Sequence, residues 1–520
     1  MQEDFASTTG SHRWVRNTSR TQVPVAPRPP GRLHSVVLSD IHLADAEPLD
    51  PKRPMWKAFK RREHFVDADV ARLLAWTAEQ AEAAGDSCEV VFNGDVFDFD
   101  PITALPDPPP SKLRWLARAR GLGSEEWCSQ FKMGLIVADH PDFFGAIGDF
   151  VRRGHRVAFV IGNHDLELYW PSVQEQVREA LQLEADAQQR VRFCEWFYLS
   201  DGDVYISHGH QADPYCVLSD PIHPLIDVRG KPTVRLPFGD VANRYMLNGM
   251  GYFNPHATAN YIMSGAEYVR FFLKYMVRDQ PLLIVTWFWS AAVTLLVTIA
   301  HFLRPSLRDP LTVEDKVAGI AERANATPAM VRQLAAAHTP SACTNPLAIV
   351  RELWLDRGVL FLVMVWAAWT IIMSLNLVWP ISPLWVLLPL SLLFPLFLAY
   401  SFRVKPETFS APLLTERSAQ WIHRITGAHM AVMGHTHIPE VREIGPIRFC
   451  NAGFWSPAFA EPECRTRIGT QTFAWIAPTV GGERRLELME WPPGAEAPRP
   501  VAASAPAAPA GATTADPGHR

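Results

Sequence analysis

Short apolar runs that each end in acidic, amide or imidazole side chains constrain the fold of this chain most strongly. Such runs cover residues 35–38, 89–92, 156–161, 204–206 and 430–433. Runs of this length and composition predict buried strands of an α/β sheet, and ligands bind at the carboxyl ends of strands in open sheets. We therefore expect five strands to present the polar side chains that follow them at one edge of the sheet.

The polar clusters that follow these runs contain ligands for divalent metal ions. In chain order they are Asp40 with His42, Asp95 with Asp98, Asn163 with His164, His208, and His435 with His437. Alternate residues of an extended segment share a face, so each of the pairs Asp40/His42 and His435/His437 can chelate one ion. Carboxylate, amide and imidazole ligands without thiolate favour Mn²⁺, with Fe or Zn²⁺ as alternatives. Any one cluster alone could be a turn, but their order after successive strands predicts a centre of two metal ions.

The chain resembles the calcineurin-like metallophosphoesterase superfamily in these clusters. The resemblance lies in Asp40-x-His42, Gly94-Asp95-x-x-Asp98, Gly162-Asn163-His164-Asp165, His208 and Gly434-His435-x-His437. It extends to the bacterial branch of the UDP-2,3-diacylglucosamine hydrolases through His208-Gly209-His210-Gln211, Gly434-His435-Thr436-His437-x-Pro439 and Asn451-Ala452-Gly453-Phe454-Trp455. The implied fold is an α/β sandwich of two mixed β-sheets flanked by helices.

The resemblance also implies roles for the residues. One ion would be held by Asp40, His42 and His437, the other by Asn163, His208 and His435, with Asp95 between them, and a bridging hydroxide would attack phosphorus. His164 would protonate the leaving oxygen and Asp98 would orient it. Two positions depart from the branch, which usually has Arg in place of His164 and an acidic residue in place of His210. His210 is either a support for the metal ligands or a polar loop residue.

Three apolar stretches between His210 and His435 predict a membrane region. They are Leu282–Leu303, Val359–Trp379 and the proline-containing Leu384–Tyr400. Because His208 and His435 must meet at one metal, the chain between them must cross a membrane an even number of times. We expect the first two stretches to cross and the third to lie in the interface or re-enter. The alternative is a helical hairpin over 359–400 with 282–303 as a surface-embedded helix.

Composition and charge set the remaining expectations. We expect a leader at 1–30, phosphoesterase parts at 31–278 and 404–490, a membrane insertion at 279–403 with a helical connector at 304–357, and a disordered Ala/Pro-rich tail at 491–520. The net charge of −5 argues against a nucleic-acid partner. Seven scattered cysteines predict no disulfide framework. No signal-peptide core is found near the start, so a catalytic head in the cytoplasm is expected.

Two segments that mix cations and aromatic residues are candidates for substrate or lipid contact. Residues 56–62 and 112–120 have helical spacing, and Arg114, Trp115 and Arg118 stand out; a solvated amphipathic helix is the simpler interpretation. The sequence thus predicts a membrane-anchored, two-metal phosphohydrolase for a phosphoester or pyrophosphate, with membrane lipids as partners and a substrate that is amphiphilic or lipid-linked. Alternatives are a tethered enzyme for soluble nucleotides or phosphoproteins, and a non-catalytic membrane scaffold.

Overall fold

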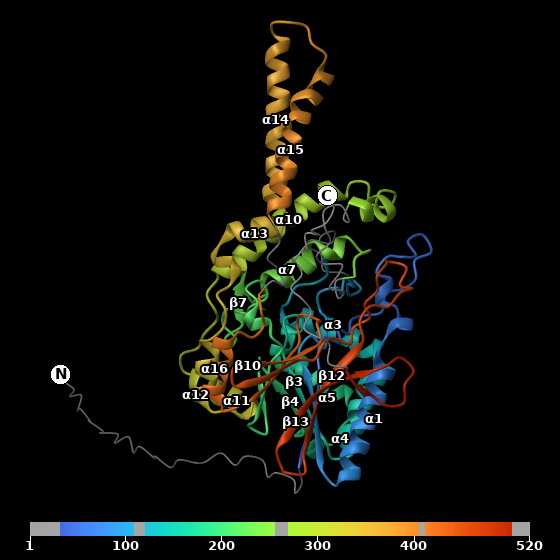
Figure 1. The fold of residues 1–520 in the computed structure, drawn as a ribbon, viewed down its shortest axis with the longest axis vertical. Coiled ribbons are helices and arrows are strands. Elements are labelled where there is room, and N and C mark those ends of the chain that lie inside the picture. Colours follow the sequence, from blue (N-terminus) through green and yellow to red (C-terminus); the bar gives the residue numbers. More distant parts are fainter. Residues whose placement is uncertain (1–31, 109–119, 255–268, 405–410, 502–520) are drawn as a thin grey trace, which may run out of the picture.

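The computed structural model describes residues 32–108, 120–254, 269–404 and 411–501. The leader expected at 1–30 and the three substrate-binding candidates Arg114, Trp115 and Arg118 lie outside these residues. Two β-sheets with helices on their outer faces form a head, and two long helices project from one end of it (Figure 1).

The larger sheet has seven strands in the order β14-β13-β12-β1-β2-β3-β4. Its parallel half consists of β1 (Leu33–Leu38), β2 (Ser87–Asn93), β3 (Arg156–Val160) and β4 (Val191–Cys194). The antiparallel half continues from β1 through β12 (Gln471–Pro478), β13 (Arg484–Trp491) and β14 (Arg499–Pro500). Because β14 pairs with β13, the head continues past the boundary expected at residue 490. Residues 502–520 of the expected tail lie outside the described residues.

The smaller sheet has five strands in the order β10-β11-β9-β6-β5. They are β5 (Tyr198–Ser200), β6 (Val204–Ile206), β9 (Met430–Met433), β10 (Glu440–Ile444) and β11 (Ile447–Asn451). The expectation of one sheet for all five ligand-bearing strands is wrong, because β6 and β9 belong to this second sheet. The two sheets share an apolar core that contains Val37, Val91, Val160, Ile206 and Val432. The α/β sandwich of two mixed sheets flanked by helices is confirmed.

Helices cover the outer face of the larger sheet. They are α1 (Asp67–Ala84), α3 (Glu126–Asp139), α4 (Pro141–Arg152) and α5 (Pro171–Ala180), with the short α6 (Ala185–Gln188) beside them. Their apolar faces join Phe92 and Phe159 of the sheet in one core, in which these two rings stack with centroids 5.0 Å apart. A parallel strand covered on both faces is buried along its length, as β2 is after its first residue, the polar Glu89 and Asn93 included.

The connector expected at 304–357 is part of the head. Its helices α11 (Val313–Arg323) and α12 (Pro328–Ala335) pack with α16 (Glu416–Thr426) over the outer face of the smaller sheet. Ile320 and Val331 are buried there with Ile422 and Phe449, and the Leu199 amide donates a hydrogen bond to the Ala324 carbonyl over 3.0 Å. The connector was expected between two membrane crossings, on the far side from the head. That placement is wrong, because its amphipathic helices bury their apolar faces on the sheet.

The three apolar stretches form helices of two kinds. α14 (Leu355–Asn376) and α15 (Leu387–Arg403) pack against each other as the projecting hairpin, joined through η8 (Pro383–Val386). α15 continues through Pro395. We expected the prolines to break the third stretch, and they do not. α10 (Leu283–Leu303) lies at the base of the hairpin and packs on α7 (Phe238–Tyr245) of the head (Figure 1). The segments Val285–Leu303, Leu355–Asn376 and Pro383–Arg403 are each long and apolar enough to span a membrane.

Short elements complete the described chain. They are η1 (Ala58–Lys60), η2 (Arg62–His64), η3 (Leu166–Tyr169), η4 (His210–Ala212), β7 (Leu225–Val228), β8 (Lys231–Val234), η5 (Leu247–Gly249), the π-helical η6 (Phe272–Met276), η7 (Ala342–Thr344) and α13 (Pro346–Glu352). β7 and β8 form a separate two-stranded sheet. Of these, η1, η4 and η5 lie beside the functional site.

Candidate metal centre

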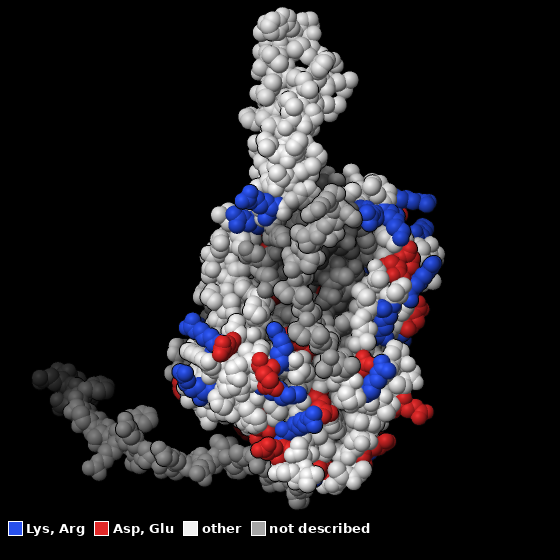
Figure 2. Space-filling view, in the orientation of Figure 1, with Lys and Arg blue, Asp and Glu red and all other residues white. Residues whose placement is uncertain are grey.

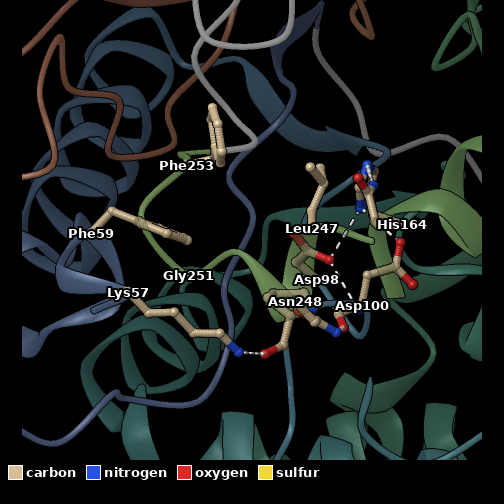
Figure 3. A pocket seen from close by; sticks show the side chains of 11 residues that line it. Lys57, Phe59, Asp98, Asp100, His164, Leu247, Asn248, Gly251 and Phe253 are labelled. Carbon is tan, nitrogen blue, oxygen red and sulfur yellow. Dashed lines mark hydrogen bonds and ion pairs between the residues drawn. The ribbon is translucent and has the colours of Figure 1, made fainter. Parts of the chain in front are cut away.

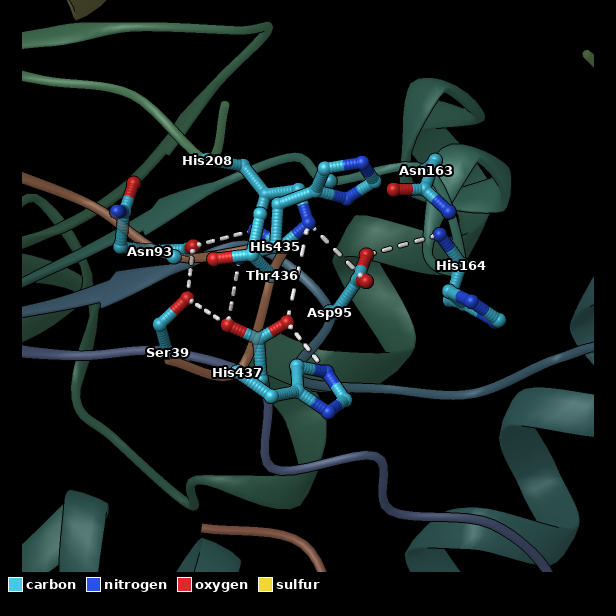
Figure 4. A network of polar contacts seen from close by, with 12 residues as sticks. Ser39, Asn93, Asp95, Asn163, His164, His208, His435, Thr436 and His437 are labelled. Carbon is cyan, nitrogen blue, oxygen red and sulfur yellow. Dashed lines mark hydrogen bonds and ion pairs between the residues drawn. The ribbon is translucent and has the colours of Figure 1, made fainter. Parts of the chain in front are cut away.

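The ligands predicted from the sequence converge where strands of both sheets end (Figure 4). Asp40, His42, Asp95, His435 and His437 all have positive φ, between 52° and 69°. Non-glycine residues seldom adopt this conformation, and it concentrates at functional sites that the surrounding structure holds in place. The backbone argument from alternation along an extended strand is therefore wrong for both Asp-x-His and His-x-His. Asp40 and His42 still lie in one group of ligand atoms, whereas His435 and His437 lie in different groups.

Glycine is required where the backbone passes closest to two of the candidate ligands. A Cβ atom on Gly434 would lie 1.8 Å from Ser39 Oγ and 2.4 Å from Asp40 Oδ2. A Cβ atom on Gly162 would lie 2.2 Å from Asp95 Oδ1. Real Cβ atoms do not approach other atoms this closely, so both aspartates depend on a neighbouring glycine for their position.

Asp40, His42 and His437 form the first group of ligand atoms. Asp40 Oδ1 lies 3.1 Å from His437 Nε2 and 3.9 Å from His42 Nε2, and the two imidazole nitrogens are 3.4 Å apart. The other carboxylate oxygen, Oδ2, accepts hydrogen bonds from the Ser39 hydroxyl and from the His435 amide. Burial raises the pKa of Asp40, but His208 and His437 outweigh it and bring the pKa to about 2. One ionised oxygen and two imidazole nitrogens thus converge on one point.

Asp95 links this group to a second one. Its Oδ1 accepts a hydrogen bond from the His164 amide over 2.9 Å. Its Oδ2 lies 3.1 Å from His208 Nε2 and 4.0 Å from His42 Nε2. Asp95, His208 and His435 bring ligand atoms within 4.8 Å of one another. Asp95 Oδ2 therefore faces histidines of both groups, as a carboxylate that bridges two ions must.

The second group is oriented by residues that the sequence did not single out. His208 Nδ1 lies 3.0 Å from the Asn93 carbonyl, which leaves Nε2 to face Asp95. His435 Nε2 lies 3.0 Å from Asp213 Oδ2, which leaves Nδ1 for an ion. Hydrogen bonds of this kind set the tautomer and direction of histidines that ligate metals. Asp213 stands alone in its loop, so no spacing rule could have identified it.

The donor set fits two divalent ions of the Mn²⁺, Fe or Zn²⁺ type. Ions with nitrogen and oxygen ligands at about 2.0–2.2 Å bring neighbouring ligand atoms to about 3 Å or more, in keeping with the separations of 3.1–4.0 Å seen here. Asn163 Nδ2 donates to Asp240 Oδ1 over 3.4 Å. Among the described residues nothing donates a hydrogen bond to the buried Asn163 Oδ1. A buried amide oxygen without a donor costs about 1–3 kcal/mol, and a metal ion at that point would remove the cost.

His164 lies beside the centre in a shell of carboxylates. Its Nδ1 is 3.1 Å from Asp98 Oδ1 and 3.3 Å from Asp100 Oδ2, and its Nε2 is 3.5 Å from Asn243 Nδ2. Burial lowers the pKa of His164, but Asp98 and Asp95 outweigh it and hold the pKa well above its usual value. The pairing with Asp98 that the sequence predicts is present, and Asp100 and Asn243 are additional partners.

Asp98 serves two histidines rather than one. While Oδ1 faces His164, Oδ2 lies 3.4 Å from His42 Nδ1. Asp100 in turn forms a buried ion pair with Arg244 of α7, which also pairs with Glu167. Asp98 therefore supports both the candidate ligand His42 and the candidate acid His164. Of these two histidines, Asp100 contacts His164.

Comparison with protein families identifies the origin of this arrangement. Residues 33–237 match the model of the family described as calcineurin-like phosphoesterase. Over these residues the chain is similar to calcineurin-like phosphoesterases. This family consists of metal-dependent phosphoric ester hydrolases that use two divalent ions, and the protein is accordingly a metal-dependent phosphoric ester hydrolase. No curated protein matches the chain.

The candidate ligands come from two separated parts of the chain. The family match ends at residue 237, but His435 and His437 lie in the same cluster as Asp40, Asp95 and His208. β9, which precedes these two histidines, pairs in parallel with β6, which precedes His208. The chain between β8 and α16 is thus inserted without separating the candidate ligands in space.

A pocket opens in front of His164 (Figure 3). Its space, part of which is open to solvent, is about 350 Å³, and it is lined by His164, Asp98, Asp100 and Lys57 together with the apolar Phe59, Leu247 and Phe253. Lys57 Nζ donates to the Pro101 carbonyl over 3.1 Å, and burial lowers the pKa of Lys57 to about 7. The pocket therefore joins the candidate acid and a buried lysine to an apolar wall.

The segment 56–62 is not a solvated amphipathic helix. It forms the tight turns η1 and η2, and Lys57 and Lys60 are buried with 3% and 4% exposure. Lys60 pairs with Asp45 at 2.5 Å. The segment departs from the predicted solvated helix because its lysines find partners inside the head. Lys57 and Phe59 of this segment line the pocket.

His210 is buried beside the centre and is not a loop residue in solvent. Its ring lies 5.6 Å from that of His208, and its Nε2 is 3.1 Å from Gln211 Nε2. Burial lowers the pKa of His210 well below its usual value, and the nearby His208 lowers it further. A neutral imidazole that packs behind His208 fits the supporting role that the sequence left open.

Proposed function

We propose that the protein is a membrane-embedded, two-metal phosphohydrolase that cleaves a phosphoester or pyrophosphate of an amphiphilic substrate. The observation that carries this proposal is the apolar wall of the pocket in front of His164. Phe253 of that wall stacks on Phe271, with ring centroids 4.6 Å apart, and Phe271 precedes the apolar helix α10. A substrate with both a phosphate and an apolar part would find partners for each.

Asp40, His42 and His437 would hold one ion, and Asn163, His208 and His435 the other, with Asp95 between them. Two bound ions stabilise charge that develops on phosphoryl oxygens and make a water nucleophilic near neutral pH. We propose Mn²⁺, with Fe or Zn²⁺ as alternatives, because the donors are oxygen and nitrogen. Cys216 lies near His435, and burial and Asp213 raise the pKa of its thiol well above the usual value.

His164 would hold a proton for the leaving oxygen. Its Nδ1 faces Asp98 and Asp100, while Nε2 lies on the side of Asn243 in the pocket. A carboxylate partner fixes the tautomer of an imidazole and favours its protonated form. Proton transfer from Nε2 is thus the step assigned to this side chain.

We propose that α14 and α15 cross the membrane as a hairpin and that α10 does not cross. At 1.5 Å per residue, α14 and the segment Pro383–Arg403 each extend about 30 Å, the thickness of a bilayer core. α10 is followed by the connector, which packs in the head, so both ends of α10 stay on the head side. This topology is the alternative weighed from the sequence and it satisfies the even number of crossings.

A cytoplasmic head is proposed from the charges around this hairpin. Arg351 and Arg403 are exposed near the base of α14 and α15, and the hairpin tip at 377–382 has no lysine or arginine. Figure 2 shows the projecting hairpin free of charged side chains, with cations beside its base. Loops rich in lysine and arginine remain on the cytoplasmic side of membranes.

Hydrolysis by the purified full-length protein in lipid nanodiscs tests the proposal. The panel contains an aryl phosphomonoester, an aryl phosphodiester, a nucleoside-diphosphate sugar and the diacylated form of that sugar, the last pair chosen for the resemblance to UDP-2,3-diacylglucosamine hydrolases. Each is assayed with Mn²⁺, with chelator, and with the Asp95→Ala variant as the metal-site control.

Metal-dependent preference for the diacylated over the plain nucleoside-diphosphate sugar is the expected result. Equal turnover of both members of that pair would reject an amphiphilic substrate and leave a tethered enzyme for soluble phosphoesters. If the metal-loaded protein cleaves no member of the panel faster than the Asp95→Ala variant does, the result would favour the non-catalytic scaffold.

A further inference from the structure

Two apolar surfaces beside the hairpin are exposed on the head. The α10 stripe consists of Leu282, Val285, Trp289, Leu296 and Leu303, each between 59% and 73% exposed. These residues are spaced by three, four and seven positions, which places them on one face of a helix. The basic ridge consists of the exposed Val269, Leu273 and Val277, each followed directly by a cation, Arg270, Lys274 and Arg278.

We propose that the α10 stripe and the basic ridge form a docking surface for anionic phospholipids, which lays the head flat on the bilayer. This inference rests on the hairpin crossing proposed above. It adds a second contact, in the plane of the membrane interface, and it names the lipid chemistry of the partner.

The packing of α10 fixes which of its faces must be covered. Phe288, Ala291 and Phe302 on the opposite face join the core around Phe238 of the head. Arg235 donates to the carbonyl of Arg304 over 2.7 Å, which ties the end of α10 to the head. The stripe therefore cannot turn inward, and a helix with one apolar face held outward is suited to the boundary between headgroups and acyl chains.

The surface lies at the level where the hairpin would enter the membrane. Phe288 of α10 lies where a side chain on Gly358, in the first turn of α14, would meet it. Figure 1 shows α10 at the base of the hairpin. The same level carries the ion pair of Arg357 with Asp356, whose carboxylate also accepts from Tyr400 of α15. Ionised groups belong in the headgroup region, which places the stripe beside it.

The charges of the ridge select the partner. Three cations that alternate with apolar side chains attract lipid phosphates, each contributing about a fivefold shift in binding to an anionic surface. A second copy that docked through the same surface would oppose its own cations to them and would be repelled. The ridge also borders the pocket, because Phe271 stacks on the pocket residue Phe253. The Tyr275 hydroxyl donates to Glu463 over 3.2 Å, which ties the ridge to the head. Docking would bring the pocket next to the lipid surface.

Depth measurements with nitroxide labels on the full-length protein test this surface. Leu273→Cys and Leu296→Cys report on the ridge and the stripe, and Leu392→Cys reports on the hairpin. Val480→Cys, in the turn between β12 and β13, is the exposed control. All are made in Cys464→Ser protein, because the other six cysteines are buried. Accessibility to oxygen is compared with accessibility to a nickel chelate in nanodiscs with and without phosphatidylglycerol.

Labels at 273 and 296 should be several-fold more accessible to oxygen than to the chelate, relative to 480, in anionic discs. Labels at 273 and 296 that behave like 480, with 392 in the bilayer, would overturn the docking surface but leave the hairpin intact. A label at 392 in water would instead reject the hairpin itself. Dipolar broadening between copies at 273 or 296 would show a second chain in place of lipid.

Charge reversal tests the choice of anionic lipid. In the triple variant Arg270→Glu, Lys274→Glu, Arg278→Glu, the docking equilibrium read by the label at 296 should fall about fivefold for each cation lost. The matched control reverses three exposed arginines of α16, β10 and β13, namely Arg417, Arg442 and Arg485. Docking that is unchanged in the first triple variant, or equally reduced in both, would overturn the role of the ridge.

Discussion

Replacement of His164 by alanine separates proton donation from metal binding. The ring is held by Asp98 and Asp100 through Nδ1, and the candidate ligand next to it in the chain is Asn163. A positioned general acid contributes about 10²–10⁴-fold, which corresponds to about 3–5 kcal/mol of transition-state stabilisation. The variant should lose that factor on an alkyl phosphoester, whose leaving alkoxide needs a proton. It should lose little on a nitrophenyl ester, whose leaving group departs as an anion.

The assay measures kcat for a series of esters with leaving groups of increasing basicity, with metal content determined on the same preparation. His164→Ala should retain two ions per chain and show a steeper dependence of kcat on leaving-group basicity. Asp100→Asn should share this behaviour in weaker form. Asp98→Asn should also lose metal, because Asp98 Oδ2 lies 3.4 Å from His42 Nδ1. An equal loss across the whole series in His164→Ala would refute the acid role.

Three further perturbations test the site and the membrane region. Asp213→Ala should weaken retention of one of the two ions by about 10–100-fold in a chelator competition, because its carboxylate orients His435. Gly434→Ala should abolish metal-dependent turnover, because a Cβ there would displace Asp40. In the control Gly427→Ala the Cβ meets nothing within 4 Å, so this change should cost about 1 kcal/mol of stability and leave turnover intact. Equal turnover in the two variants would contradict this. Leu392→Arg should raise the insertion free energy by about 3 kcal/mol and shift protein from the membrane fraction to aggregates; unchanged membrane extraction would argue against a spanning α15.

The ligand positions were predictable because their chemistry is local. Asp40, Asp95 and His208 each follow a strand that hydrophobicity alone reveals, so the sequence places them at strand ends without knowledge of the fold. Their backbone conformation was not predictable, since Asp40, whose φ is positive, bonds through its backbone to Gly94, Trp455 and Ser456, which are distant in sequence. The division of the strands between two sheets was likewise invisible in the strands themselves.

Residues that act through long-range contacts left no local signal. Asp213 and Asn243 meet His435 and His164 only after the chain has folded, and neither stands in a recurring motif. The apolar stretches were found correctly by length, but length does not say which face is already covered. The burial of α11 and α12 on the smaller sheet, and not hydropathy, distinguishes the hairpin from α10.

α7 explains why the apolar insertion and the metal centre belong to one unit. One face of this helix carries Asp240 and Asn243, which contact Asn163 and His164. Its other face contributes Phe238 to the core that holds α10. Because one short helix contacts both regions, α10 cannot be treated as a detachable anchor. Removing it would expose Phe238 and loosen the two side chains that support the ligand and the acid, so activity of the head should depend on α10 even with a soluble substrate.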